Sequence, residues 1–246
     1  CIRDRAYAYG HQCCDFSDGT LVCLTPGESI SMKENNKEFP SKGWILAFHP
    51  DLICGTPLGL NIHNYTFFSY CPEEALHLSL REKQIILEFL ERIRQELERC
   101  IDRHSKKIIS KYIELLLDYC TRFYERQFIT RSEVNKKVFR EFNHLLDNHF
   151  NVKVSLSTDV LSDEYCANLL HLSPAYFNDL LKYEIGKEFK EYIQFKRFEI
   201  AKGWLVNTDK TLGQIAQELG FSNSQYFSRL FKKITGCSPN EFRMPN

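Results

Sequence analysis

The sequence lacks the cysteine pairing that marks a secreted disulfide scaffold. Its 246 residues include 10 cysteines, but they are scattered, and no two stand in a Cys-x-x-Cys pair. A disulfide framework is typical of short secreted chains, and this chain is of middle length and has no apolar leader. We therefore expect reduced cytoplasmic thiols, most of them buried as small hydrophobic side chains.

Long apolar runs are also missing. No stretch approaches the roughly 18 apolar residues that a membrane-spanning helix needs. Hydrophobic residues make up 43% of the chain and charged residues 26%, which is typical of soluble globular proteins of one or two domains. The chain starts with Cys1 rather than methionine and opens inside a β pattern, so we expect that further residues precede it.

The chain also has no excess of positive or negative charge, since its formal net charge is +0. A balanced chain neither suggests nor excludes nucleic acid, because a basic patch can be offset elsewhere.

One pattern occurs twice near the C-terminus. The segment from Tyr176 reads YFNDLLKYEIGKEF, and the segment from Tyr226, fifty residues later, reads YFSRLFKKITGCSP. An internal repeat indicates one supersecondary unit used twice. The apolar side chains of each copy are expected to face the core: Tyr176, Phe177, Leu180 and Tyr226, Phe227, Leu230.

Each copy forms the second helix of a helix–turn–helix pattern. In the first copy a short helix over 163–170 precedes a turn at 171–172. Ser173 is suited to cap the next helix, and Pro174 takes its first position, where a missing N–H has no cost.

In the second copy the first helix spans 212–219 and Gly220 supplies the turn. Ser222 or Asn223 caps the recognition helix. A helix over 189–206 lies between the copies and is about 27 Å long. Successive major grooves on one face of DNA lie about 34 Å apart, so such a helix could hold both copies near that separation.

The faces opposite the apolar residues carry side chains that can read bases. Arg pairs with guanine and Gln with adenine in a major groove. The candidate base readers are Ala175, Asn178 and Asp179 in the first copy and Ser224, Gln225, Ser228 and Arg229 in the second. The candidate phosphate contacts are Lys182, Lys232, Lys233 and Arg243.

At these residues the sequence resembles the AraC/XylS family of bacterial transcription regulators. The resemblance covers about 159–243 and is carried by Ile215-Ala216, Gly220-Phe221, Tyr226-Phe227, Arg229, Phe231-Lys232-Lys233, Gly236, Ser238-Pro239 and Arg243. It implies a non-enzymatic, sequence-specific regulator that binds double-stranded DNA through two helix-turn-helix motifs. The implied further partners are a second copy of the chain, a small-molecule effector and RNA polymerase.

One residue departs from this pattern. Asp179 stands where the second copy has Arg229. An aspartate near DNA repels phosphate and could accept only from a cytosine amino group. We therefore expect the second copy to carry more of the base recognition.

Residues 1–80 read as short strands and turns. Strand candidates lie at 20–24, 30–33 and 43–49, and 65–70 is an aromatic strand or 3₁₀ segment. Many short strands favour a barrel or sandwich. This region resembles, more weakly, the cupin-type sensing domain common in the family, in partial form.

Residues 81–127 carry two apolar stripes at helical spacing, joined by a polar turn at 102–107, which predicts an αα-hairpin. The hairpin covers the sheet, forms a homodimer interface, or does both. The dimerisation candidates are Ile86, Leu90, Ile93 and Leu97. A third helix is expected at 131–149.

The sequence thus predicts an α+β multidomain chain. A partial cupin-like region of antiparallel β structure occupies 1–80, and a helical dimerisation or cover segment occupies 81–150. A linker spans 151–158. An all-α AraC-type DNA-binding domain with two helix-turn-helix motifs occupies 159–246.

The sequence leaves two enzymatic alternatives to a transcription regulator. A metal-dependent cupin enzyme would need clustered ligands, but the chain has no His-x-His pair, and the cluster of His11, Cys13 and Cys14 is more typical of ordinary interior or surface residues. A DNA-repair methyl acceptor would need a zinc site and a reactive cysteine beside histidine, and Cys71 has other neighbours. We expect neither a metal nor a cofactor.

Overall fold

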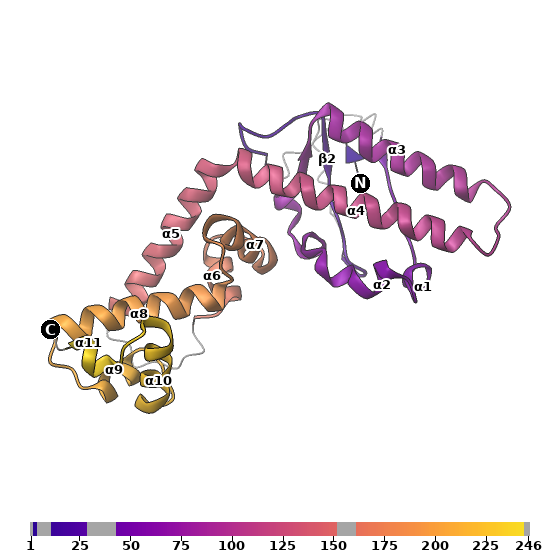
Figure 1. Ribbon diagram of the computed structural model, residues 1–246. Helices are drawn as coiled ribbons and strands as arrows, with labels where there is room; N and C mark the ends of the chain where they lie inside the picture. The colour runs from indigo at the N-terminus through magenta and orange to yellow at the C-terminus, as the bar shows by residue number, and fades with distance from the viewer. Residues whose placement is uncertain (1, 4–10, 29–42, 152–160, 244–246) are drawn as a thin grey trace.

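The computed structural model describes residues 2–3, 11–28, 43–151 and 161–243. Figure 1 shows two parts: a sheet with a helical hairpin formed by the N-terminal half, and a group of helices formed by the C-terminal third. Helix α5 runs from the first part into the second.

The strands of the first part are short and antiparallel. They pair in the order β3-β1-β2-β4. Their bounds are Ile2–Arg3 for β1, Gly19–Leu21 for β2, Gly43–Trp44 for β3 and Leu76–Leu78 for β4. Within the residues described, this sheet has β3 and β4 at its edges and does not close on itself, so the cupin-like barrel is not confirmed.

Several predicted strands differ from the observed elements. The strand expected at 43–49 pairs over only two residues, because beyond Trp44 the register with β1 ends and Ile45 is 82% exposed. The strand expected at 20–24 is β2, which ends at Leu21. Within 65–70, Thr66–Ser69 form a 3₁₀ helix, η2, which is the second of the two alternatives predicted for this segment. The candidate at 30–33 lies outside the described residues.

Short helices connect β3 to β4 and position two side chains used below. Their bounds are α1 Pro50–Ile53, α2 Pro57–Asn61, η1 Ile62–Asn64, η2 as above, and η3 Pro72–Glu74. Tyr70 directly follows η2 as its C-cap residue, and Glu74 is the last residue of η3.

The predicted αα-hairpin is present as α3 (Leu80–Leu97) and α4 (Ser105–Thr130), which pack along each other and against β4. Ser79 and Glu82 form a capping box that starts α3. Three of the dimerisation candidates, Ile86, Leu90 and Ile93, are buried in the core of this part and offer no surface to a second copy. Leu97 alone among the four is exposed, at 59%.

Helix α5 (Ser132–Asn151) follows α4 with only Arg131 between them. Its Phe142 and Leu146 are fully buried in a core shared with α6 (Asp163–Leu169), α7 (Pro174–Ile185) and α8 (Phe189–Asn207). The domain boundary expected at 151–158 therefore separates helices that share one core. Residues 152–158 of that predicted linker are outside the described ranges.

The last part is built on α8, α9 (Leu212–Glu218), α10 (Ser224–Thr235) and α11 (Pro239–Arg243). Phe198 from α8 packs with Phe227 and Phe231 from α10 in its core. The N-terminal half of α8 supplies Phe189 and Tyr192 to the preceding core. One helix thus carries two units, as the sequence predicted.

The cysteines differ from the expectation that most would be buried. The nine cysteines within the described ranges are free thiols. Two are buried, Cys120 and Cys166, and five are exposed: Cys13, Cys14, Cys54, Cys71 and Cys100. The hydrophobic character of cysteine predicted too much burial, because these five cysteines lie in loops and at the ends of helices, which are at the surface. Across the described chain, no helix combines the length and the apolar character that a bilayer crossing requires.

Candidate nucleic-acid interface

The two repeat copies fold alike, with α6–α7 as the first helix–turn–helix and α9–α10 as the second. Ser173 and Asn223 cap the two second helices by accepting the backbone N–H groups of Tyr176 and Tyr226. Asn223 rather than Ser222 is thus the second cap. Both second helices end at a glycine with positive φ, Gly186 and Gly236.

The turns between the paired helices differ by one residue. The first turn spans 170–173 and the second 219–223. At equivalent places His171 and Gly220 have φ of 57° and 73°. Glycine adopts this left-handed conformation freely, whereas histidine does so at some cost. Ala167 and Ala216 are buried where each pair of helices crosses.

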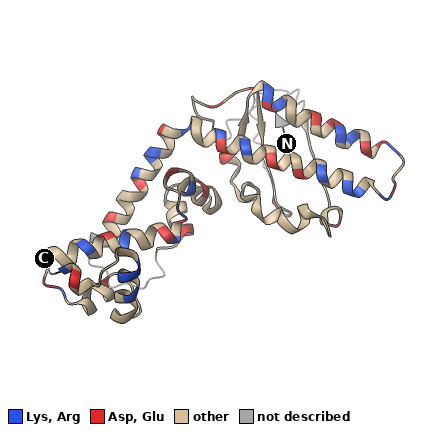
Figure 2. Cartoon of the chain, in the orientation of Figure 1, with Lys and Arg blue, Asp and Glu red and all other residues tan. Residues whose placement is uncertain are grey.

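Helix α10 presents a polar, basic face to solvent. Gln225, Arg229, Lys232 and Lys233 are exposed, whereas Ser224 and Ser228 are partly buried beside them. The Lys and Arg positions along this helix are coloured blue in Figure 2. Four of these six side chains can therefore reach a DNA surface without rearrangement.

Tyr226 lies on this open face, although the repeat predicted it in the core. It is 41% exposed, and its ring lies 5.8 Å from the Arg229 guanidinium. Phe227 alone of the pair points inward, with 0% exposure. Consecutive residues lie about 100° apart around a helix, so burial of both side chains needs packing partners in two directions.

The corresponding face of α7 is covered by the N-terminal part. Tyr176 is 4% exposed and packs edge-on against Tyr70, with ring centroids 5.1 Å apart. The Tyr70 hydroxyl donates to the Asp179 carboxylate at 2.7 Å. Burial, followed by the charge of Asp179, raises the pKa of Tyr70, which keeps this hydroxyl protonated as a donor.

The other first-copy candidates are also engaged within the chain. The Asn178 amide donates to Asp163 and to the Pro174 carbonyl, both at 3.0 Å. Lys182 pairs with Glu188 at 2.9 Å. Ala175 is partly buried against the N-terminal core. The structure therefore brings the first-copy candidates together on one helix, where Ala175, Asn178 and Asp179 are partly buried against other segments whereas Lys182 is exposed.

Glu74 holds the start of α7. Its carboxylate accepts the Ser173 backbone N–H at 2.7 Å and the Ser173 hydroxyl. Glu74 is 4% exposed, and burial raises the pKa of its carboxyl group despite these hydrogen bonds. A carboxylate at a helix N-terminus also interacts favourably with the helix dipole.

Arg131 lies at the junction of α4 and α5, where the N-terminal part and α7 meet. Its guanidinium donates to Asp15 at 2.9 and 2.5 Å and to the Tyr176 hydroxyl at 3.5 Å. The Arg131 and Asp15 side chains are 6% and 0% exposed. Burial alone would raise the pKa of Asp15, but the hydrogen bonds from Arg131 and its charge hold that pKa below the usual value.

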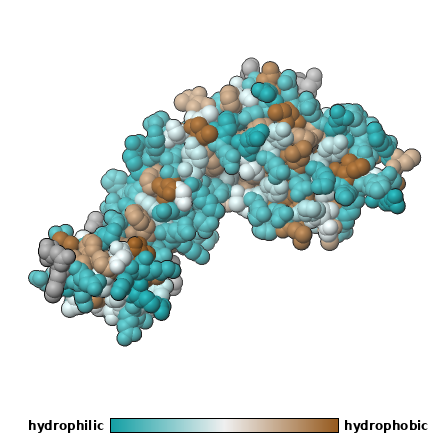
Figure 3. All heavy atoms as spheres, in the orientation of Figure 1, coloured by the Kyte–Doolittle hydropathy of each residue, from teal (hydrophilic) through white to brown (hydrophobic). Residues whose placement is uncertain are grey.

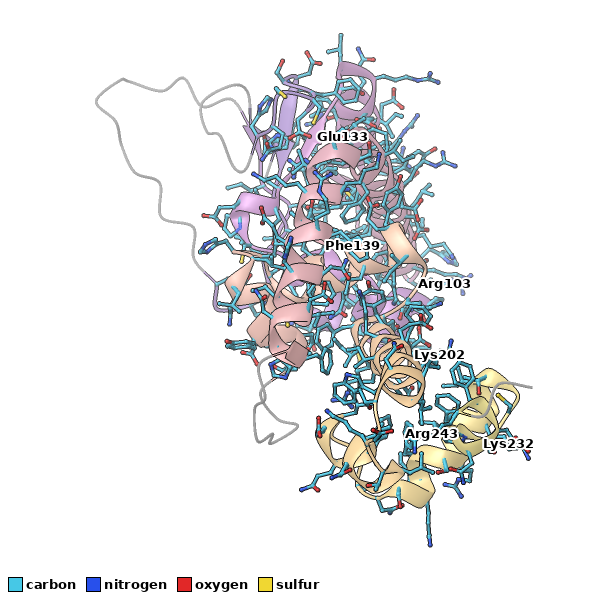
Figure 4. All side chains as sticks on the ribbon, turned by 90° about the vertical axis from the view of Figure 1, so that its left-hand side faces the viewer. Arg103, Glu133, Phe139, Lys202, Lys232 and Arg243 are labelled. Carbon is cyan, nitrogen blue, oxygen red and sulfur yellow. The ribbon has the colours of Figure 1, made fainter. Side chains whose placement is uncertain are left out.

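Arg243, a candidate phosphate contact, is oriented into the domain. Its guanidinium donates to the backbone carbonyls of Leu205 and Lys210, at the end of α8 and in the following loop. In Figure 4, Lys232 lies at the outer side of this domain and Arg243 further inward. Arg243 thus ties α11 to α8, and Lys232 and Lys233 remain the exposed basic candidates of the second copy.

Sequence reasoning missed Tyr70, Glu74, Asp15 and Arg131. Each belongs to a segment with its own local pattern, and their partners lie 45 to 116 residues away along the chain. The one signal in the sequence was Asp179. An acidic residue among the candidate base readers indicated that α7 has a partner other than DNA.

The metal ligands considered above do not converge. His11, Cys13 and Cys14 are exposed, and the His11 ring packs edge-on against His77 at 5.0 Å. Over the described ranges no group of three or more His, Cys, Asp or Glu side chains is arranged to hold a metal ion.

Two capped helix–turn–helix units on one shared helix define a double helix-turn-helix module, a class of fold that places helices in the DNA major groove. Residues 166–244 match the family described as a helix-turn-helix domain. This segment is a helix-turn-helix domain of the AraC type, as the sequence resemblance indicated.

Curated relatives are similar to different shares of the chain. It is 33% identical over 111 residues to the HTH-type transcriptional regulator YtdP of Bacillus subtilis, covering 45% of this chain and 14% of YtdP. It is 41% identical over 86 residues to the bifunctional transcriptional activator/DNA repair enzyme AdaA of the same species, covering 35% and 41%. The chain thus spans less than half the length of these two relatives.

A third relative is similar along most of the chain. The HTH-type transcriptional regulator YijO of Escherichia coli is 24% identical over 225 residues, covering 92% of this chain and 76% of YijO. Among solved structures, the C-terminal domain of AraT, a response regulator from Geobacillus stearothermophilus, is 33% identical and covers 43% of this chain and 83% of its own, with a TM-score of 0.37.

Proposed function

We propose that this protein is a sequence-specific DNA-binding transcription regulator. The observation that carries the proposal is the solvent-facing side of α10, where Gln225, Arg229, Lys232 and Lys233 project from a capped helix in a helix–turn–helix. Arginine and glutamine read base edges, and lysines bind phosphate. The names of YtdP and YijO, both transcriptional regulators, support the same function.

The N-terminal part is proposed to act as the regulatory part of the molecule. It contacts the DNA-binding domain through α7, so a small-molecule effector bound there could alter DNA binding. RNA polymerase and a second copy of the chain are the further partners that regulation of this kind needs. We place the protein in the bacterial cytoplasm, where its DNA target lies.

Enzymatic activity is not part of the proposal. AdaA carries a DNA repair activity in its name, but the match covers 41% of AdaA. Burial and the neighbouring Glu74 carboxylate raise the pKa of Cys71, whereas a nucleophilic thiol needs a lowered pKa.

The direct test is selection of bound sequences from a random DNA pool with the full chain. Enrichment of a defined site is expected. Arg229→Ala should then weaken binding by about 1–3 kcal/mol at one base position and flatten the preference there. Lys232→Ala should weaken binding to all sequences about equally and lower the salt dependence.

Two results would count against the assignment. One is a pool without enrichment. The other is a uniform loss for Arg229→Ala across base-substituted sites, because a residue that contacts only phosphate shows that behaviour.

A further inference from the structure

The repeat allows each position on α7 to be compared with the α10 position fifty residues later. On α10, Gln225, Tyr226 and Arg229 are exposed. Their counterparts on α7 are Ala175, Tyr176 and Asp179, and all three face the N-terminal part. The N-terminal part therefore covers on α7 the same face that α10 leaves open for DNA.

The side chains of α7 fit this protein surface better than a DNA groove. Tyr176 and Leu180 belong to the N-terminal hydrophobic core, with 4% and 1% exposure. Tyr176 contacts the rings of Tyr70 and Phe128 at 5.1 and 5.2 Å. Asp179, which would repel a phosphate, accepts a hydrogen bond from Tyr70.

The start of α7 is filled as well. The N-terminus of a recognition helix is a place where backbone N–H groups bind a DNA phosphate. On α7 the buried Glu74 carboxylate already accepts the N–H and the hydroxyl of Ser173, so an anion is in place. The equivalent cap on α10, Asn223, is exposed.

We propose that each chain reads DNA through α10 alone and that α7 is the docking helix for the N-terminal part. This inference rests on the proposed DNA-binding function and narrows it. One chain contacts one major groove, and the specificity-determining residues are Gln225 and Arg229, not Asn178 and Asp179. A reading by both helices would require Tyr176 and Leu180 to leave a hydrophobic core.

The test compares two variants that remove the same hydrogen bond from opposite sides. Asp179→Ala changes the candidate reader, and Tyr70→Phe removes its donor in the N-terminal part. The site selected by the wild-type full chain is replaced at each base in turn, and affinity and hydroxyl-radical footprint are measured for every protein.

Both variants are expected to keep the wild-type base preference at every position and a footprint over one major groove per chain. Arg229→Ala is expected to lose about tenfold discrimination at one position. A change of preference of more than about fivefold for Asp179→Ala alone, roughly 1 kcal/mol, would overturn the proposal. A higher DNA affinity of Tyr70→Phe together with a footprint longer by one helical turn of DNA would also overturn the proposal. That result would mean that α7 contacts DNA once the N-terminal part no longer covers it.

Hydrogen exchange on the unmodified chain avoids any folding defect of the variants. With the selected DNA, the first turn of α10 should gain protection while α7 stays equally protected. Changed protection of α7 on DNA binding would overturn the inference. Failure of the proposed function itself looks different, since the wild-type chain would then enrich no sequence from the pool.

Discussion

At the residue scale, the pair of Asp15 and Arg131 is the most demanding feature of the molecule. Two charges are held almost without water contact at the junction of α4 and α5. Such a pair is stable only when hydrogen bonds satisfy both groups, and here Arg131 also reaches Tyr176. The pair therefore links the segment around Asp15 to the α4–α5 junction and, through Tyr176, to α7.

We predict that Asp15→Asn lowers the free energy of unfolding by about 3–5 kcal/mol at pH 7, because it leaves a buried guanidinium without its counter-charge. The folded-state pKa of Asp15 lies below its ordinary value of 3.8. The stabilisation is thus complete above pH 3.8 and is lost as the pH falls through the lowered pKa. Urea unfolding of the wild type and of Asp15→Asn at pH values above and below 3.8 measures this difference in the free energy of unfolding.

Glu133→Gln is the matched control, because it removes an exposed ion pair with Lys136 near the same junction. Exposed pairs contribute about 0–1 kcal/mol, so this variant should unfold almost as the wild type does. If Asp15→Asn behaved like Glu133→Gln, or kept its full effect at acid pH, the buried pair would not stabilise the junction.

At the element scale, the second helices of the two repeat copies, α7 and α10, have equivalent caps in unequal surroundings. Asn223→Ala removes an exposed cap and should cost about 1 kcal/mol. Ser173→Ala should cost about 1–3 kcal/mol more, because it also leaves the buried Glu74 carboxylate without a hydroxyl donor. Denaturant unfolding followed by circular dichroism compares them, and equal losses would show that Glu74 contributes nothing at this cap.

The helices of the DNA-binding domain could be predicted from sequence because their signals are local. Caps, helix-ending glycines and apolar spacing lie within a few residues of each other, and α7, α8 and α10 begin within one residue of the predicted positions. The exposure of Gln225, Arg229, Lys232 and Lys233 on α10 followed from the same periodicity, and their contact with DNA stays a prediction.

The environment of α7 could not be predicted in this way. Tyr176 and Tyr226 occupy the same repeat position, yet one is 4% and the other 41% exposed. The difference arises from Tyr70 and Phe128, which lie much earlier in the chain and whose rings pack against Tyr176. A pattern that repeats along the sequence carries no information about such a partner.

The N-terminal sheet was predicted less well for a related reason. Its described strands are two or three residues long, too short for alternation to be recognised. Their pairing connects distant segments, such as Thr20 with His77.

At the scale of the whole molecule, the two ends present different surfaces. Helix α10 lies at one end, and the tip of the α3–α4 hairpin lies at the other. The tip exposes apolar side chains on a largely hydrophilic surface, as Figure 3 shows in brown. They include Leu97, Ile101 and Ile108, with exposures of 59%, 83% and 37%.

A dimer formed through this tip is the form of the predicted homodimer that agrees with the burial of Ile86, Leu90 and Ile93. Leu97→Glu should then shift the sedimentation of the chain from dimer toward monomer and leave its unfolding midpoint unchanged. Leu90→Glu, only 7% exposed in the wild type, should instead lower the free energy of unfolding by more than about 3 kcal/mol, because it buries a charge in the hairpin core.

The two variants separate assembly from folding. Each chain that reads one major groove through α10 needs a second chain to recognise a longer site. Leu97→Glu should therefore also reduce affinity for a two-groove site while preserving the base preference within each half. An unchanged oligomer for Leu97→Glu would remove the hairpin tip from the interface, and reduced preference within a half-site would show that the substitution disturbs α10 itself.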